Sequence, residues 1–324
     1  MATLAPSLLR NRSPHLRPFR PASDLRPVAE LIETCFADTL DADGRRYVRQ
    51  LRYIADNPAL LRWRESGRQR GPVPEAGFVW EEDGRVVGNA SLVPFHEGRT
   101  RRYLIANVAV LPAYRRRGIG KALTRACIGY ALEHGNTPPW LHVRAENEEA
   151  IRLYRHAGFV EQARRDTWYS NGASQEVTLL DGMELVSRKR GDWPLQRQWF
   201  EAVYPPAIQW QFPVRTAWLR PGVGGWAARL WHGIFLRQWS LHYRGRLIGV
   251  LTWQSGAGRK TALWLSLHPA YEAMSIPVLL RFAHNRIRSS SLLALDYPAG
   301  RSTEAIARSG FKLHQTLVWM RWTP

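Results

Sequence analysis

The segment from Arg115 to Lys121 has the residue types and spacing of a site for a phosphate-bearing anion. Gly118 and Gly120 stand at the start of a predicted helix, after an apolar strand and a turn containing Pro112. Glycine lets backbone N–H groups approach a ligand closely, and a helix N-terminus offers unpaired donors and a positive dipole end. Four basic side chains add charge: Arg115, Arg116, Arg117 and Lys121. Such a loop suits a pyrophosphate, although a glycine pair also occurs in plain turns.

A second group of polar residues follows on the next predicted strand and helix. His142 lies on a strand over 140–144, and Asn147 precedes a helix over 148–156 that carries Tyr154. Alternation along the strand puts His142 on the same face as Arg144. A neutral imidazole, with an ordinary pKa of about 6.5, accepts a proton, and a phenol, with a pKa of about 10, donates one. Histidine and tyrosine are therefore residue types that can carry out acid–base chemistry.

The two blocks together resemble the cofactor-binding motifs of the GNAT superfamily of N-acetyltransferases. The family signature Arg/Gln-x-x-Gly-x-Gly/Ala is matched by Arg115, Gly118 and Gly120. The second block is especially similar to that of the bacterial ribosomal-protein N-terminal acetyltransferases. The resemblance extends over about Leu16–Val186, and the two blocks are specific when they occur together.

This resemblance implies that acetyl-CoA is the cosubstrate. The cysteine pattern does not suggest a zinc site, and no metal is expected. It assigns a contact with the pantetheine arm to Asn147 and the proton donor to the departing thiolate to Tyr154. A backbone N–H near Val108 or Val110 is expected to stabilise the oxyanion. The implied cofactor-binding residues are Val108, Ala109, Val110, Arg115, Arg116, Arg117, Gly118, Ile119, Gly120, Lys121 and Asn147. The alternative for Tyr154 is a core residue, since it stands at helical spacing from Ala150.

The sequence departs from the ribosomal enzymes at the general base. Their glutamate, five residues before the asparagine, is replaced by His142. His142 is therefore either the base or a residue that only lines the cleft, and both interpretations stay open. If it only lines the cleft, His96 and Glu97 at the end of a neighbouring strand are the next candidates.

Hydrophobic periodicity and turn signals predict the elements that position these residues. Helices are expected to begin at Asp24, Arg45, Gly118 and Glu148. Strands are expected over 16–20, 77–82, 85–94, 103–111, 140–144, 160–169 and 177–186, the last two as a closing pair. Hairpins combined with one parallel crossover predict an α/β fold, with a mixed, mostly antiparallel twisted sheet flanked by helices.

The second half of the sequence repeats the first in outline. Segments 83–88, 108–114 and 157–159 find echoes, in the same order, at 244–249, 265–271 and 309–311. Two copies of one fold are therefore predicted, with a catalytic domain over 1–186, a linker over 187–194 and a degenerate domain over 195–324.

The second copy lacks the residues of the anion site. Arg115, Gly118 and Gly120 are replaced at the corresponding positions by Glu272, Ser275 and Pro277, and Tyr154 by Ile306. A glutamate repels phosphate and a proline has no backbone donor. We therefore expect the second copy to be a scaffold that does not bind acetyl-CoA.

Composition limits the partners. The formal net charge is +19, which would attract nucleic acid, acidic membranes or small anions. The arginines do not form one basic tract, so a nucleic-acid partner is not expected and a polyanionic cofactor accounts for part of the excess. No apolar run approaches the length of a membrane span, and no membrane partner is expected.

The two cysteines, Cys35 and Cys127, are predicted to be buried free thiols in a cytoplasmic protein. Residues 1–16 are expected to form a loose tail, with a transit peptide as the alternative.

We therefore expect an acetyl-CoA-dependent N-acyltransferase that acetylates a primary amine on a small molecule, a protein N-terminus or a lysine. The sequence leaves the acceptor and the oligomeric state open. Two rival functions also remain: a CoA-binding regulator without turnover, and a basic nucleic-acid-binding protein on the same scaffold.

Overall fold

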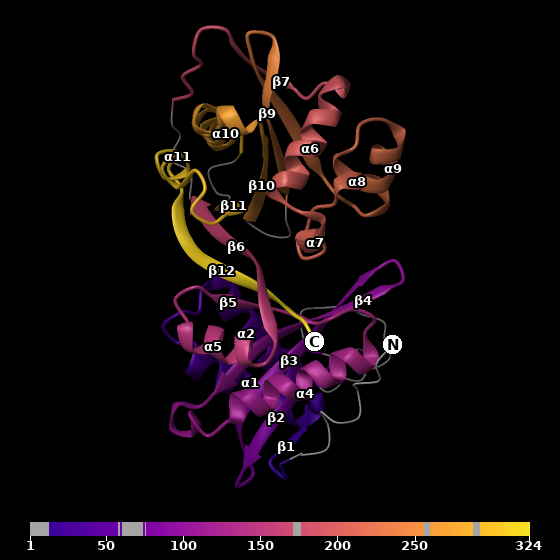
Figure 1. The fold of residues 1–324 in the computed structure, drawn as a ribbon, viewed down its shortest axis with the longest axis vertical. Coiled ribbons are helices and arrows are strands. Elements are labelled where there is room, and N and C mark those ends of the chain that lie inside the picture. The colour runs from indigo at the N-terminus through magenta and orange to yellow at the C-terminus, as the bar shows by residue number, and fades with distance from the viewer. Residues whose placement is uncertain are drawn as a thin grey trace. The chain divides into compact units, whose positions relative to one another are not determined.

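The structure is a computed structural model, which describes residues 13–57, 59, 74, 76–170, 176–255, 260–287 and 292–324. The chain forms two compact units (Figure 1). Unit 1 comprises Met1–Gln162 and Val318–Pro324, and unit 2 comprises Ala163–Leu317. Most of the tail predicted over 1–16 lies outside the described residues.

Unit 1 is built on a mixed sheet. Its elements are β1 Leu16–Pro18, α1 Pro21–Cys35, α2 Ala42–Ala55, β2 Ala76–Glu82, β3 Arg85–Glu97, β4 Thr100–Val110, the 3-10 helix η1 Pro112–Tyr114, α4 Ile119–His134, β5 Trp140–Arg144 and α5 Glu148–His156. Strands β1 to β4 pair antiparallel in sequence order, and β4 pairs parallel with β5. The α/β class and the mixed sheet are as predicted.

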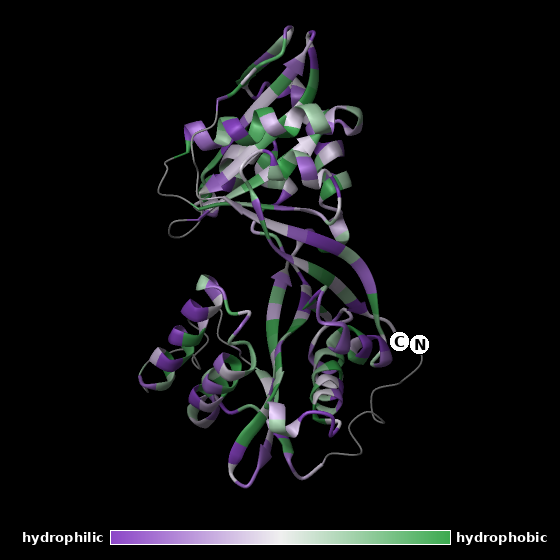
Figure 2. Ribbon diagram, turned by 90° about the vertical axis from the view of Figure 1, so that its left-hand side faces the viewer, coloured by the Kyte–Doolittle hydropathy of each residue, from purple (hydrophilic) through white to green (hydrophobic). Residues whose placement is uncertain are grey.

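Helices cover both faces of this sheet, and each face has its own core (Figure 2). One core joins α1 and α2 to the sheet through residues such as Leu25, Leu51 and Val79. The other joins α4 and α5 to the opposite face through residues such as Leu123, Ile151 and Leu141. Burial of a leucine or isoleucine side chain stabilises the fold by about 1.5–3 kcal/mol. The sheet is therefore held rigidly between two layers.

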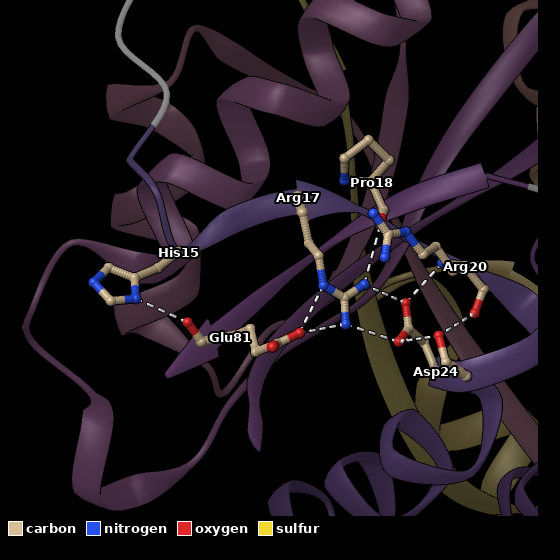
Figure 3. A network of polar contacts seen from close by, with 7 residues as sticks. His15, Arg17, Pro18, Arg20, Asp24 and Glu81 are labelled. Atoms are coloured by element: carbon tan, nitrogen blue, oxygen red, sulfur yellow. Dashed lines mark hydrogen bonds and ion pairs between the residues drawn. The ribbon is translucent and has the colours of Figure 1, made fainter. Parts of the chain in front are cut away.

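A polar network fixes the start of α1 to the sheet (Figure 3). Arg17 donates two hydrogen bonds to Asp24, at 2.7 and 2.9 Å, and one to Glu81 at 2.7 Å. The Asp24 carboxylate also accepts the backbone N–H of Arg20 at 2.7 Å. The helix was expected to begin at Asp24, but it begins at Pro21. Asp24 is instead buried inside the first turn, where it accepts the backbone N–H of the residue that precedes the helix.

Unit 2 has helices of its own, and its strands, which belong to the same continuous sheet, also pair in a mixed arrangement (Figure 1). Its elements are β7 Met183–Ser187, the 3-10 helix η2 Arg190–Asp192, α6 Trp193–Val203, α7 Pro206–Gln209, α8 Thr216–Leu219, α9 Val223–Trp231, β8 Leu236–Tyr243, β9 Arg246–Ser255, β10 Lys260–Leu267, η3 Pro269–Tyr271, α10 Glu272–Arg286, β11 Leu292–Pro298 and α11 Thr303–Ala307. Strands β7 to β10 pair antiparallel in sequence order, and β10 pairs parallel with β11.

Two strands belong to both units. Strand β6 spans Phe159–Ser170, begins in unit 1 and continues in unit 2, whereas β12 spans Lys312–Trp322, begins in unit 2 and ends in unit 1. They are neighbours in the strand order, with β5 on the other side of β12 and β11 on the other side of β6. The expected closing pair of 160–169 with 177–186 is therefore wrong, because β7 pairs with β8 instead.

The segment predicted as a linker is folded. Residues 190–192 form η2, and α6 begins at Trp193. Asp192 is buried, and its carboxylate accepts the Ser240 hydroxyl at 2.6 Å and the Lys189 backbone N–H at 2.8 Å. The boundary between the two compact units lies within β6 and β12 and not at 187–194.

The three sequence echoes adopt matching local structure. Both hairpin turns, Asp83-Gly84 and Arg244-Gly245, have two consecutive residues with positive φ. Both Pro-Ala-Tyr segments form 3-10 helices, η1 and η3. Gly158 and Gly310 each have positive φ, at 93° and 81°. These matches support the prediction of two copies of one fold.

Candidate functional site

The parallel strands β4 and β5 separate where the predicted site begins. Their pairing covers Leu104 with Trp140 and Ile105 with Leu141, and it stops there although β4 continues to Val110. The register of β4 against β3 shifts between Asn89 and Ser91, which marks a β-bulge. Beyond the bulge, β4 therefore presents backbone groups that β5 does not pair.

The bulge is fixed by the side chains of Asn89, Asn107 and Tyr47. Asn107 has a φ of 52°, in the left-handed region that asparagine tolerates better than most residues. Its backbone carbonyl accepts the side-chain amide of Asn89 at 2.9 Å, and its own side-chain amide donates to the Tyr47 hydroxyl at 2.9 Å. Burial raises the pKa of Tyr47 to about 12, so the phenol is neutral. An asparagine inside an apolar strand was the signal that could have identified this feature.

The loop from Arg115 to Lys121 lies at the end of β4 and leads into α4. Gly118 is the N-cap of α4 with a φ of 79°, and an added Cβ would meet nothing within 4 Å. A Cβ on Gly120 would lie 3.2 Å from the Leu153 side chain of α5. The backbone conformation therefore favours glycine at position 118, and Gly120 packs closely against α5. As the N-cap, Gly118 directly precedes the first helical turn, whose N–H groups have no partner within the helix.

The basic side chains of the loop differ in their contacts. Arg115 donates to the Val110 carbonyl at 3.2 Å, and Arg117 donates to the Ala113 carbonyl at the same distance. Arg116 is exposed and pairs with Glu149 at 2.9 Å. Lys121 is exposed on the first turn of α4. Among the described residues, these contacts leave most of the positive charge of the loop in contact with solvent.

Asn147 and Tyr154 both belong to α5. The Asn147 side-chain oxygen accepts the backbone N–H of Ala150 at 3.0 Å and so caps the helix, while its amide group can still donate. Tyr154 is buried in the core on the α4 side, with its ring edge against Phe159. Burial raises the pKa of Tyr154 well above its ordinary value, and the nearby Cys127 thiol acts in the same direction. The phenol is therefore protonated throughout the neutral range.

His142 lies on the opposite face of the sheet. Leu141 and Val143 enter the core that contains Tyr154, so strand alternation turns His142 toward the face of α1 and α2. Its ring stacks on Trp319 of β12, with centroids 4.4 Å apart. His142 follows directly after the last residue of β5 that pairs with β4. The structure thus places His142 and Tyr154 on opposite sides of the sheet, with His142 directly after the end of the β4–β5 pairing and Tyr154 in the core under α4 and α5.

The alternative base candidates lie elsewhere. His96 is exposed and pairs in register with Arg101, close to the hairpin turn that joins β3 to β4 and away from the bulge. The side chain of Glu97 is outside the described residues.

The corresponding opening in unit 2 is filled by its own side chains. Pairing between β10 and β11 ends at Leu263 and Leu295. Just beyond it, the hydroxyl of the fully buried Tyr204 donates to the Asp296 carbonyl at 2.9 Å and hydrogen bonds with the Leu265 backbone. Tyr204 therefore connects β10 and β11 in unit 2. The equivalent strands of unit 1, β4 and β5, stand apart at the corresponding place.

The start of α10 is also occupied. The buried Glu272 carboxylate accepts Arg301 Nε at 3.0 Å and the Ser302 hydroxyl at 2.9 Å. A carboxylate at a helix N-terminus neutralises the positive end of the helix dipole. In unit 2 the Glu272 carboxylate thus lies at the start of α10, whereas the corresponding loop of unit 1, before α4, carries no acidic side chain.

A surface pocket of about 600 Å³ lies beside the Arg17 network, between α1 and the β2–β3 hairpin. None of the predicted site residues lines it. Among the residues that the structure describes, no cluster of His, Cys, Asp and Glu side chains could hold a metal ion. Within the same residues, no helix is both long enough and apolar enough to cross a membrane.

Comparison with known proteins agrees with this geometry. A family model described as the acetyltransferase (GNAT) family matches residues 37–159. The [ribosomal protein bS18]-alanine N-acetyltransferase of Escherichia coli K12 is 38% identical over 79 residues, which cover 24% of this chain and 53% of that protein. N-alpha-acetyltransferase 30 of Schizosaccharomyces pombe is 32% identical over 100 residues, or 31% of this chain and 67% of that protein. The chain spans about half the length of the bacterial relatives that it matches.

A solved structure resembles the whole chain. The GCN5-related N-acetyltransferase from Sphaerobacter thermophilus aligns with a TM-score of 0.58, covering 96% of both chains at 15% sequence identity. At this identity the similarity concerns the fold, and it includes both units.

Proposed function

The chain belongs to the GNAT family of acetyltransferases, and from that premise we propose that it transfers an acetyl group from acetyl-CoA to a primary amine. The observation that carries the proposal is the opening between β4 and β5 beyond Ile105, with a left-handed bulge on one side and the open N-terminus of α4 at its end. Several of its relatives are named as N-acetyltransferases, including one that acts on an alanine of ribosomal protein bS18.

Residues of unit 1 fit acetyl-CoA as the cosubstrate. The first-turn N–H groups of α4, Gly118 and the exposed Lys121 suit the pyrophosphate. The unpaired edge of β4 at 107–110 offers donors and acceptors for the amides of the pantetheine arm, and the free amide of Asn147 offers another donor. Bound acetyl-CoA supplies an activated thioester.

The backbone of the bulge provides the electrostatic part of the mechanism. Preorganised N–H groups stabilise an oxyanion without reorganising during the reaction. The Val110 backbone hydrogen bonds with the Cys35 thiol, so the N–H of Val108 is the better candidate. Asn89 and Tyr47 hold Asn107, which precedes Val108, in its left-handed conformation.

The two proton transfers of the reaction are assigned to residues on opposite sides of the sheet. His142, on the α1–α2 side, removes the proton from the acceptor amine directly or through a water molecule. Tyr154, on the α4–α5 side, supplies a proton to the departing sulfur. The amine therefore approaches from the side of α1 and α2, and the acceptor is a small molecule or a protein.

An acceptor screen tests the proposed function. The full chain is incubated with acetyl-CoA and an array of small amines, peptides with free N-termini and lysine peptides, and release of CoA thiol is measured. We expect amine-dependent thiol release that stops when Gly118 is changed to glutamate. Tight acetyl-CoA binding with no thiol release for any acceptor would instead favour a CoA-binding regulator. Binding to random duplex DNA with a steep dependence on salt, and no binding of acetyl-CoA, would favour a nucleic-acid-binding protein.

A further inference from the structure

Helix α9 in unit 2 turns its apolar side to solvent. Val223, Trp226 and Leu230 stand at helical spacing, and 79%, 58% and 64% of their surfaces are exposed. Trp231 and Phe235 follow with 87% and 78% exposed. A surface helix of a globular protein normally buries its apolar stripe. We call these five residues the α9 patch.

The opposite side of α9 is packed tightly, so its orientation is fixed. Gly225 is buried, and a Cβ there would lie 1.9 Å from the Arg220 carbonyl oxygen, which shows how closely the helix meets the preceding turn. Arg229 donates to the Trp218 carbonyl at 2.6 Å and thereby ties α9 to α8. The two helices lie side by side in unit 2 (Figure 1). The outward direction of the patch therefore follows from packing.

The stretch of sequence that carries the patch is basic. The sequence contains no Asp or Glu between Glu201 and Glu272. The basic residues in this stretch are Arg215, Arg220, Arg229, Arg237, Arg244, Arg246, Arg259 and Lys260. Arg220 and Arg237 flank the patch and are exposed, and the ion pairs of the described residues include neither. The guanidinium of Arg190 lies against Gly222 at the start of α9.

We propose that the α9 patch docks unit 2 onto an anionic lipid surface. Tryptophan, phenylalanine and leucine side chains enter the boundary between headgroups and acyl chains, while arginines attract anionic headgroups. All five side chains are more than half exposed, which suits a fluid layer that adapts to them. The exposed Arg220 and Arg237 beside the patch favour a negatively charged partner. The proposal departs from the expectation of no membrane partner, and it does not depend on acetyl transfer.

Vesicle sedimentation of the full chain tests the proposal. One set of vesicles contains phosphatidylcholine alone, and the other contains phosphatidylglycerol and phosphatidylcholine in equal parts. We expect binding to the anionic vesicles, weakened by salt, and much weaker binding to the neutral ones.

Two pairs of variants locate the contact. Trp226→Ser with Trp231→Ser should weaken binding by about tenfold or more, because two large apolar side chains are lost from the boundary. Tyr53→Ser removes an exposed aromatic side chain of unit 1 and should leave binding unchanged. Arg220→Gln with Arg237→Gln should weaken binding by roughly fivefold per charge. Arg197→Gln with Arg308→Gln makes the same change of net charge elsewhere in unit 2 and should have a smaller effect.

The patch residues are exposed, so these variants should fold, and circular dichroism checks this. Three results would overturn the proposal. They are equal binding to both kinds of vesicle, no binding to either, and anionic binding that the tryptophan changes leave intact. A light-scattering mass that falls from dimer to monomer in the tryptophan variant, without vesicle binding, would assign the patch to a second copy of the chain instead.

Discussion

His142 and Tyr154, on opposite faces of one sheet, carry out the two proton transfers proposed for unit 1. Tyr154 is buried among apolar side chains, whereas His142 is half-buried and stacks on Trp319. The sequence could suggest both residues from their spacing. It could not show that they face different sides of the opening, because that depends on the end of the pairing between β4 and β5.

Replacement of Tyr154 by phenylalanine should lower kcat by about 10²–10⁴-fold, the usual contribution of general acid catalysis. The ring still packs, so acetyl-CoA affinity and stability should change little. Because burial raises the pKa of Tyr154 above its ordinary value, the phenol keeps its proton as the pH rises, and kcat of the parent protein should not fall before about pH 10. Tyr130→Phe on α4 serves as the control. A basic limb below pH 10 that disappears in Tyr154→Phe would contradict this assignment.

His142→Phe separates chemistry from packing. Phenylalanine can keep the stacking on Trp319 but removes both ring nitrogens. If His142 is the base, kcat should fall by about 10²–10⁴-fold and the acid limb of the pH–rate profile should change. Unchanged rates and an unchanged profile with a good acceptor would show that His142 only lines the cleft.

Cys35 provides a chemical reporter beside the loop. It is half-buried and in contact with Arg115 and the Val110 backbone, and burial raises its thiol pKa. Since the thiolate is the reactive form, alkylation should be slow at neutral pH. It should accelerate only as the pH rises above the ordinary pKa of a cysteine thiol. Cys127 is fully buried and should not react. Mass spectrometry should find one modified cysteine, at a rate that acetyl-CoA lowers if Arg115 contacts it. Cys35→Ser should abolish labelling.

At the scale of elements, the start of α4 is the part that matters most for the anion. Gly118→Glu adds a negative charge and a Cβ at positive φ, and it should remove measurable acetyl-CoA binding by calorimetry. Gly245→Glu is a matched control, because Gly245 also has a positive φ, at 75°, and open space around its Cα, but lies in a hairpin turn of unit 2. That variant should keep the parent affinity. If a folded Gly118→Glu protein binds acetyl-CoA normally, the loop is not the pyrophosphate site.

Local signals predicted some elements accurately. Strand β5 and helix α5 have the predicted bounds, since turn residues precede the strand and Asn147 caps the helix. Other features depend on distant partners, and the sequence pattern does not identify these partners. The bulge at Asn107 needs Asn89 and Tyr47, and the segment 187–194 folds because Asp192 is buried against Ser240.

At the scale of the whole molecule, the two units are similar in outline but differ in their openings. Tyr204 bridges β10 and β11, and Glu272 neutralises the start of α10. We therefore expect calorimetry to give one acetyl-CoA per chain. Gly118→Glu should abolish all binding, whereas a second site in unit 2 would leave half of it. A stoichiometry of two in the parent protein would contradict this prediction.

The passage of β12 from unit 2 into unit 1 has a consequence for biosynthesis. Val318 and Met320 belong to the core of unit 1, and Trp319 stacks on His142. A ribosome makes these residues only after all of unit 2, so the N-terminal part of unit 1 emerges with an apolar gap beside β5. Domains made early in synthesis usually fold first. Here the core of unit 1 is completed only after unit 2 has been made, and until then the edge of β5 that β12 covers is open to pairing with other chains.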